Sequence, residues 1–245
     1  MPSSSGYQTN KVIQAAQYDE KLRNAVEDSA ERMLKFILKY QQNFHETYDS
    51  QAHHQVARQI ARESMVLLKN DVILPLNRDD KIAMIGGFAF DMRYQGGGSS
   101  HINPTKLDQL IDIDKHYSDH IIFSKGYGIK DMSEDDIHLK NAIKVAKEVD
   151  KVVLFVGLPD SKETEGFDRK TLDIPESHKQ LIIEISKVNP NIVVVAIAGS
   201  VVNLDFEDQV NGILMAYLGG QASASAVLDL LSGIETPSGR LAETF

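Results

Sequence analysis

The chain has 245 residues, of which 42% are hydrophobic and 25% are charged, as is typical of soluble globular proteins. Its formal net charge of -9 and its isoelectric point near 5.4 disfavour nucleic acids and anionic membranes as partners, because both bind basic surface patches. The absence of cysteine excludes disulfides and thiolate metal sites, and the absence of a signal-peptide core or of an apolar run of roughly 20 residues predicts a cytoplasmic chain that crosses no membrane.

The first predicted element is a long amphipathic helix over residues 19–41. Its apolar residues recur every three or four positions, at Leu22, Val26, Ala30, Met33, Ile37 and Tyr40. A helix with one apolar face requires a partner that covers it. We therefore expect this region to pack against another domain or to make the chain a homo-oligomer.

A linker and a second helix follow. Residues 43–54, with the sequence NFHETYDSQAHH, break the periodic pattern with polar side chains. Apolar residues then return at helical spacing and predict a helix that ends near LLKND, at 67–71. These residues are Val56, Ile60 and Met65. We take 1–50 as a helical segment that belongs with another domain, and 51–245 as the main domain.

Beyond Pro75 the pattern changes to short apolar strands. Nearly continuous runs of β-branched residues indicate strands that are buried on both faces. The predicted strands are KIAMIG at 81–86, IIFSKG at 121–126, KVVLFVGL at 151–158, NIVVVAIAG at 191–199 and GILMAY at 212–217.

Helices fit between several of these strands, at about 134–149, 176–188 and 222–232. The first of them has Ser133 as a predicted N-cap, with Asp136 three residues further on. Strands that alternate with helices predict an α/β fold, here a three-layer α/β/α sandwich with a mostly parallel sheet.

A glycine-rich segment, YQGGGSSHINP at 94–104, can approach a ligand or another chain closely, because glycine tolerates positive φ angles. The glycines are Gly96, Gly97 and Gly98, and the hydrogen-bonding residues after them are Ser99, Ser100 and His101. Phosphate binding is one interpretation, but the spacing matches neither GxxxxGK[ST] nor a GxGxxG that opens a helix. A flexible loop without a ligand is the alternative.

The sequence predicts no metal site and no cofactor. His53 and His54 are adjacent, so on a helix they point about 100° apart and cannot share one metal ion, and we expect both at the surface. Neither HExxH nor a calcium-loop spacing occurs. The segment AGSVV at 198–202 lacks the second glycine of the GxSxG motif of serine hydrolases.

The loop after the strand at 151–158 carries the strongest candidate chemistry. Its sequence, GLPDSKETEGFDRKTLDIP, includes Glu163 and Glu165. Loops that leave strand ends commonly carry function in α/β proteins. A carboxyl group beside an apolar residue such as Phe167 can have a raised pKa and act as a general acid.

Two further features of this loop limit the interpretation. Glu163 and Glu165 are two residues apart, so on an extended segment only one of them points into a given pocket. We expect Asp168 and Arg169 to pair and to hold the loop in shape. On the residue pattern alone, a solvated surface loop remains the alternative to a catalytic loop.

The combination of segments resembles a known family over roughly residues 55–245. The segments, in order, are ARESMVLLKND, KIAMIG, YQGGGSSHINP, VVLFVGLPDSKETEGFDRKTLDIP, VNPNIVVVAIAGS and GILMAYLGGQASASAVLDLLSGIETPSGRLAETF. They resemble the carboxy-terminal sandwich domain of family 3 glycoside hydrolases, the β-glucosidase group. In that family the active site lies between this sandwich and an amino-terminal (β/α) barrel that carries an aspartate nucleophile. The helix at 19–41 resembles the last helix of that barrel.

The resemblance implies roles for individual residues. The family's acid/base is the glutamate directly before Gly-aromatic-Asp-Arg, which here is Glu165, and Glu163 is the second choice because this loop varies in length. The GGGSS loop lies near the mouth of the sugar pocket in the family, which implies that Ser99, Ser100 and His101 contact substrate or a neighbouring loop. Phe167 and Tyr94 either stack on a sugar or aglycone face or serve ordinary packing.

The resemblance thus implies part of a retaining β-glucosidase that acts on a β-glucoside or oligosaccharide. The sequence includes an acid/base but no barrel and no nucleophile, so we expect the chain to be inactive alone. Two other classes stay open. One is a non-catalytic carbohydrate-binding or interaction module on the same fold, and the other is a nucleotide-binding α/β protein.

Overall fold

The computed structural model describes residues 6–41, 47–113, 117–118, 120–128 and 135–245. The chain divides into two compact units, Met1–Asp49 and Ser50–Phe245. Ser133, the expected N-cap of a helix, lies outside the described residues.

The first unit contains two helices, α1 (Tyr7–Tyr18) and α2 (Glu20–Tyr40). The long helix predicted at 19–41 is confirmed by α2, whereas α1 was not predicted. Asp19 caps α2, because its carboxylate accepts a hydrogen bond from the backbone N–H of Leu22 at 3.1 Å. Large apolar side chains on α2, among them Met33 and Ile37, are exposed. The described residues therefore leave the apolar face of α2 uncovered.

The second unit is built on a single six-stranded sheet with the strand order β1-β6-β5-β4-β2-β3. The strands are β1 (Val66–Asn70), β2 (Ile82–Ile85), β3 (Ile121–Ser124), β4 (Lys151–Gly157), β5 (Ile192–Ile197) and β6 (Gly212–Met215). Strands β2 to β6 pair in parallel, and β1 pairs antiparallel with β6 at one edge. The five predicted strands are confirmed. Their side chains are almost entirely buried in β2, β4, β5 and β6, as continuous apolar runs require.

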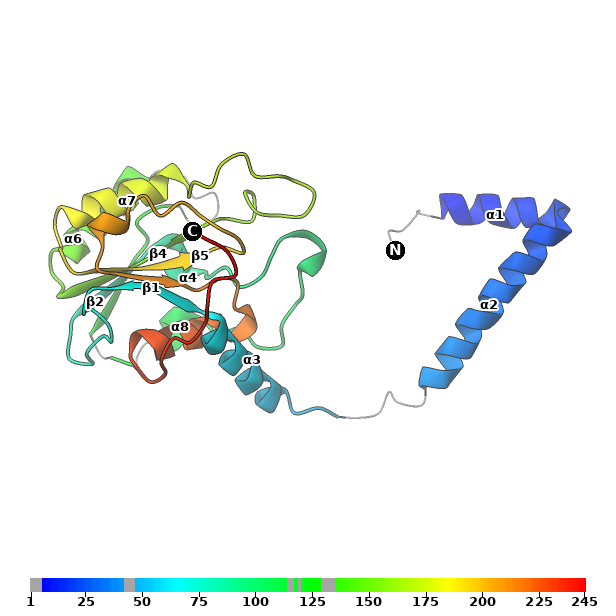
Figure 1. Cartoon of the computed structure of the whole chain (residues 1–245), viewed down its shortest axis with the longest axis horizontal. Helices are drawn as coiled ribbons and strands as arrows, with labels where there is room; N and C mark the ends of the chain where they lie inside the picture. The colour runs from blue at the N-terminus through cyan, green and yellow to red at the C-terminus, as the bar shows by residue number, and fades with distance from the viewer. Residues whose placement is uncertain (1–5, 42–46, 114–116, 119, 129–134) are drawn as a thin grey trace. The chain divides into compact units, whose positions relative to one another are not determined.

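Helices cover both faces of the sheet, with α6 and α7 on one side and α3 and α8 on the other (Figure 1). The helices of this unit are α3 (Ser50–Ser64), α4 (Gly87–Phe90), α5 (Leu110–Ile113), α6 (Asp136–Ala146), α7 (Glu176–Ser186) and α8 (Ser223–Leu231). Asp135 caps α6 by accepting hydrogen bonds from the backbone N–H groups of Ile137 and His138. The predicted three-layer α/β/α fold with a mostly parallel sheet is confirmed. Among the described residues, no helix combines the length and the apolar composition needed to cross a bilayer.

Two predictions near the start of this unit were wrong. The segment 50–54, expected to be part of a linker, forms the first turns of α3. The segment LLKND, expected to end a helix, belongs to β1, which adds an antiparallel edge to the parallel sheet. No turn residue separates Ser64 from Val66, so the sequence contains no local signal that divides the helix from the strand.

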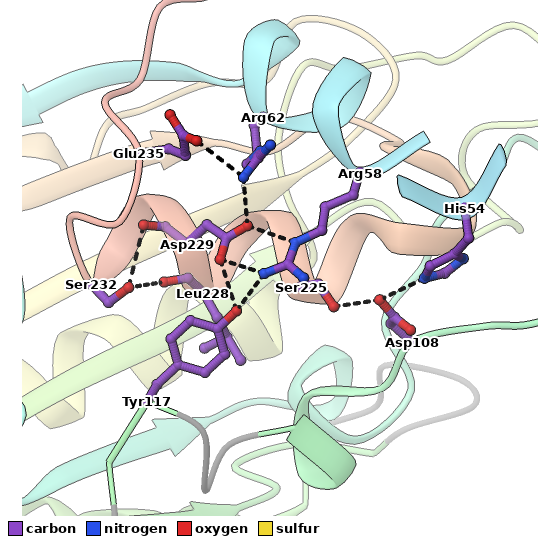
Figure 2. Close-up of polar contacts among 10 residues, drawn as sticks. All are labelled: His54, Arg58, Arg62, Asp108, Tyr117, Ser225, Leu228, Asp229, Ser232 and Glu235. Atoms are coloured by element: carbon purple, nitrogen blue, oxygen red, sulfur yellow. Dashed lines mark hydrogen bonds and ion pairs between the residues drawn. The ribbon is translucent and has the colours of Figure 1, made fainter. Parts of the chain in front are cut away.

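A buried ion pair joins α3 to α8 (Figure 2). The side chain of Asp229 on α8 is fully buried, and its two oxygens accept hydrogen bonds from Arg58 on α3 at 2.7 and 2.5 Å. Arg62, one turn further along α3, lies 3.3 Å from the same carboxylate, and the Tyr117 hydroxyl donates to it at 2.8 Å. A buried carboxylate requires such partners, because desolvation penalises its charge.

A second cluster anchors the start of α3. Gln221 donates to Nδ1 of His54 at 2.8 Å, so Nε2–H of His54 donates to Asp108 at 3.0 Å, and Ser225 of α8 donates to the same Asp108 oxygen. Burial raises the pKa of Asp108, but the hydrogen bonds from Ser225 and His54 outweigh burial and hold that pKa below its ordinary value. The expectation that His54 lies at the surface was wrong, since only His53 is exposed.

The substitution Asp229→Asn tests the buried ion pair. It leaves Arg58 and Arg62 facing a neutral group, so we expect it to lower the free energy of unfolding by about 3 kcal/mol or more. The matched control is Glu235→Gln, which removes the 51% exposed partner of Arg62 and is expected to cost less than about 1 kcal/mol. Urea unfolding of the variants measures both values. Equal effects of the two substitutions would contradict the assignment.

A buried histidine supports the carboxyl end of β4. His178 of α7 is fully buried, lies with its ring centroid 4.0 Å from that of Tyr127, and accepts a hydrogen bond from the backbone N–H of Gly157 at Nδ1. The Tyr127 hydroxyl donates to the carbonyl of Phe155 at 2.6 Å. These two rings therefore fix the last residues of β4, from which the loop containing Glu163 and Glu165 departs.

Because His178 is buried, we predict that the free energy of unfolding falls in acid. Burial lowers the pKa of His178 to about 3, from an ordinary value of 6.5. Between these two pH values His178 binds a proton in the unfolded chain but not in the folded chain. The contribution of His178 to the free energy of unfolding is therefore complete above pH 6.5 and is lost as the pH falls toward 3. From pH 7 to pH 5 we expect the parent chain to lose roughly 2 kcal/mol of unfolding free energy relative to His178→Gln, which does not titrate. Urea unfolding at each pH measures the difference, and parallel pH profiles would refute it.

Candidate active-site loops

The sheet topology brings two loops together at one edge. The chain runs from β2 to β3 on one side and then crosses to β4 on the other side of β2, so the order reverses between β2 and β4. In parallel α/β sheets, the carboxyl ends of strands at such a point flank a crevice that commonly holds a ligand. The loop after β2 contains the glycine-rich segment 94–104, and the loop after β4 contains residues 158–175, which we call the acid loop.

A cleft of about 520 Å³ lies between these two loops. Its lining combines apolar groups with hydrogen-bonding side chains, as ligand sites usually do. From the loop after β2 it includes Phe88, Asp91, Met92, Arg93, Tyr94, Gln95 and His101, and from the acid loop Pro159, Asp160 and Ser161. Tyr94 and His101, both proposed from the sequence as substrate contacts, thus line one cleft.

Glu165 of the acid loop contacts the glycine-rich loop directly. One of its oxygens, Oε2, accepts hydrogen bonds from the backbone N–H of Ser99 at 3.1 Å and from the Ser99 hydroxyl at 2.6 Å. The other oxygen, Oε1, has no hydrogen-bond partner among the described residues. Glu165 is exposed, so this free oxygen can meet a molecule from solution.

The glycines allow the two loops to approach. A Cβ atom at Gly97 would lie 2.4 Å from Oγ1 of Thr164, and one at Gly98 would lie 3.0 Å from Oε2 of Glu165. Gly98 also has a φ of +79°, which side-chain-bearing residues rarely adopt. In this structure Gly97 and Gly98 therefore allow close approach between two segments of the same chain.

Glu163 of the acid loop is held by residues from two other loops. Its carboxylate accepts hydrogen bonds from Arg93 at 2.6 Å, from the backbone N–H of Gly199 at 2.8 Å and from the Ser200 hydroxyl. Burial raises the pKa of Glu163, but these hydrogen bonds outweigh burial and lower it below its ordinary value. Both oxygens of Glu163 are occupied, in contrast to those of Glu165.

The structure does not provide surroundings that would raise a carboxyl pKa in the acid loop. The sequence left open a raised pKa for a carboxyl group beside Phe167, but Phe167 is 78% exposed and provides no apolar surroundings. Hydrogen bonds from the Ser99 hydroxyl and the Ser99 N–H instead lower the pKa of Glu165. In this chain Glu165 is therefore ionised at neutral pH.

Arg169 is anchored differently from the prediction. Its guanidinium donates to the carbonyl of Val201 at 2.8 Å, and no ion pair with Asp168 forms among the described residues. Arg169 thus ties the far end of the acid loop to the segment after β5. His101 lies 3.6 Å from Asp160, and Ser100 is the last residue of the short 3-10 helix Gly98–Ser100.

Sequence reasoning missed Arg93 and Ser200, which hold Glu163 in place. Arg93 is 8% exposed and follows the apolar segment after β2, so a single arginine in such a segment was the available signal. A buried arginine nearly always has a carboxylate partner. Ser200 was considered only as a possible nucleophile, and its hydroxyl is bonded to Glu163 instead.

The substitution Ser99→Ala tests the contact between the two loops. It removes the hydroxyl donor to Glu165, so the pKa of Glu165 is expected to rise toward its ordinary value. NMR titration of the Glu165 carboxyl carbon measures this change. The control is Ser161→Ala, an exposed serine at the start of the acid loop, which should leave the titration unaltered. An unchanged Glu165 titration in Ser99→Ala would show that the loops are apart in solution.

Comparison with known sequences identifies the family to which the chain belongs. Residues 65–245 match the family model described as the glycosyl hydrolase family 3 C-terminal domain. Thermostable beta-glucosidase B of Acetivibrio thermocellus is 45% identical over 251 residues, which is 100% of this chain and 33% of that protein. Exo-alpha-(1->6)-L-arabinopyranosidase of Bifidobacterium breve is 41% identical over 208 residues, or 80% of this chain and 28% of that protein.

Comparison with solved structures gives the same result. The crystal structure of the family 3 beta-glucosidase of Bifidobacterium adolescentis superposes with a TM-score of 0.83 at 39% identity, and covers 100% of this chain and 36% of that one. The chain thus spans about a third of the length of these relatives. The family model matches most of the second unit, from the end of α3 through the whole sheet to the last residue, so the chain belongs to glycoside hydrolase family 3 and includes its C-terminal domain.

Proposed function

We propose that this chain is the carboxy-terminal part of a retaining β-glucosidase and that Glu165 is its general acid/base. The observation that carries the proposal is the position of Glu165, which lies on an exposed loop at the reversal point of the sheet with Oε1 free to meet a substrate. Glu163, the second choice, is unsuited to proton transfer, because Arg93, Gly199 and Ser200 occupy both of its oxygens.

In this proposal Glu165 transfers a proton in both halves of the reaction. It first protonates the glycosidic oxygen as the bond to the leaving group breaks, and then removes a proton from the water that hydrolyses the glycosyl-enzyme. The nucleophile is a carboxylate in the part of the enzyme that precedes this chain. Retaining enzymes hold the two carboxyl groups about 5 to 5.5 Å apart, so one of them alone is insufficient.

The first unit supports the view that a larger domain precedes the sandwich. Helix α2 exposes Met33 and Ile37 among other apolar side chains, which a packed neighbour would cover. Together with the relatives' greater length, this favours α2 as the last helix of an amino-terminal barrel. In the same proposal, Ser99, Ser100, His101, Tyr94 and Phe167 face the substrate from the sandwich side.

The substitution Glu165→Gln tests the assignment in the enzyme assembled from this chain and a family 3 amino-terminal domain. For a phenyl or alkyl β-glucoside, whose leaving group requires a proton, we expect kcat/KM to fall by about 10² to 10⁴. For a 2,4-dinitrophenyl β-glucoside, whose leaving group departs as an anion, kcat/KM should change far less. Steady-state kinetics on both substrates measure the difference.

The matched control is Asp168→Asn, which removes an exposed carboxylate three residues further along the same loop. It should leave the preference between the two substrates unchanged. Full activity of Glu165→Gln on the alkyl glucoside would reject Glu165 as the acid. Hydrolysis of a glucoside by the 245-residue chain alone would refute the proposal that the nucleophile lies outside this chain.

A non-catalytic carbohydrate-binding module is the second candidate. The cleft of about 520 Å³ is formed within this chain alone, which is the observation that favours it. Calorimetric titration of the 245-residue chain with glucose or cello-oligosaccharides separates the two functions. Tight binding without the preceding domain favours a module, and its absence favours a shared site.

A further inference from the structure

We propose that Arg93 is a positioning residue for the acid/base. Together with Glu163 it fixes the first half of the acid loop, so that the loop presents Glu165 at the glycine-rich segment. This inference rests on the proposed function, in which Glu165 is the acid/base. Arg93 itself contacts no reacting group in the proposal and acts through the loop.

Within the described residues, the Arg93 side chain donates its hydrogen bonds to the first residues of the acid loop. Its Nε donates to Asp160 at 2.6 Å, and its Nη1 donates to the carbonyl of Leu158 at 3.0 Å. Nη1 also donates to the carboxylate of Glu163 at 2.6 Å, and Nη2 donates to the Glu163 carbonyl at 3.0 Å. One guanidinium thus binds both the side chain and the backbone of Glu163, which fixes its position and its orientation.

Glu163 extends this contact to a third loop. Its carboxylate also binds the N–H of Gly199 and the hydroxyl of Ser200, which follow β5. The loops after β2, β4 and β5 therefore meet at the ion pair between Arg93 and Glu163. The Arg93 side chain is only 6% exposed and that of Glu163 is 17% exposed, so water screens this pair weakly.

A fixed Glu163 restricts Glu165 because a single residue separates them. Two residues of chain span at most about 7 Å, so the Cα atom of Glu165 stays within that distance of the Cα atom of Glu163. The residue between them, Thr164, packs against Gly97. Glu165 then meets Ser99, whereas the segment that follows, at Gly166 and Phe167, is exposed. We call the contacts of Arg93 with Leu158, Asp160 and Glu163 the arginine clamp. This clamp therefore determines the backbone position from which the Glu165 side chain extends.

Lysine cannot replace Arg93 in this role. The guanidinium binds three acceptor residues at once through donors in a planar fork, whereas an ammonium group on a flexible stem presents one point charge. The substitution Arg93→Lys therefore keeps the charge and the overall fold but loses the geometry. The matched control is Lys162→Arg, on the exposed part of the same loop, whose side chain makes no hydrogen bond or ion pair among the described residues.

The first measurement is hydrogen exchange in the complete 245-residue chain. We expect Arg93→Lys to accelerate amide exchange at residues 160–166 by about tenfold or more. The loss of the arginine's hydrogen bonds lowers the free energy needed to open this part of the loop. Exchange within β4 and β5 should stay unchanged. The control Lys162→Arg should leave both regions as they are in the parent chain.

The second measurement is made in the assembled enzyme with the two glucosides of different leaving group. Arg93→Lys should lower kcat/KM for the alkyl glucoside by about tenfold or more, and should change kcat/KM for the dinitrophenyl glucoside far less. A merely structural role would lower both by the same factor, because it would reduce the amount of folded enzyme.

Several outcomes would overturn the proposal. One is an unchanged acid loop in Arg93→Lys, and another is an equal loss on both substrates. If Arg93→Lys fails to fold, Asp160→Asn decides, because Asp160 is 53% exposed and contributes one contact to the clamp. Faster loop exchange in Asp160→Asn then supports the clamp, and unchanged exchange refutes it. An enzyme that keeps full activity after Glu165→Gln refutes the proposed function itself, whatever the exchange of the loop.

Discussion

Burial of the sheet on both faces is the constraint on which the rest of the molecule depends. The residues of β4 and β5 are almost entirely apolar and enclosed, so polar chemistry is confined to the strand ends. Parallel pairing places the carboxyl ends of β2, β4 and β5 at the same edge. The loops that follow these strands must therefore meet, and the reversal of strand order between β2 and β4 opens a cleft where they do.

Two carboxylates, the buried Asp229 and the partly buried Glu163, are both held by a complete set of hydrogen-bond donors but join different parts of the fold. Asp229 is held by Arg58, Arg62 and Tyr117, and it joins two helices on one face of the sheet. Glu163 is held by Arg93, Ser200 and Gly199, and it joins three loops at the edge of the sheet. Removal from water makes each pair demand complete hydrogen bonding. Because all of their oxygens are hydrogen-bonded, both carboxylates are held in place, which suits a scaffold and, in the proposed function, leaves proton transfer to Glu165.

The sequence predicted what local patterns specify and missed what distant residues specify. Runs of β-branched residues identified five strands, whereas β1 follows α3 without a turn residue and was missed. Glu165 was singled out only through the family resemblance, since the loop pattern also fitted a solvated surface. The local pattern left a raised pKa open, whereas the donor that lowers the pKa of Glu165, Ser99, lies 66 residues away. Arg93 has no spacing pattern, and only the fold shows that it reaches Glu163.

If Glu165 is the acid/base, as we propose, its lowered pKa gives a second carboxylate a further role. Hydrogen bonds from Ser99 stabilise the ionised form, which is a base and cannot protonate a leaving group. A second carboxylate about 5 Å away would raise the pKa of Glu165 by like-charge repulsion and so favour its protonated form. In the proposed reaction that carboxylate then forms an ester with the sugar, which would remove the repulsion and lower the pKa of Glu165 again. The Ser99 contact would then favour the ionised base that the second step of the proposed reaction requires.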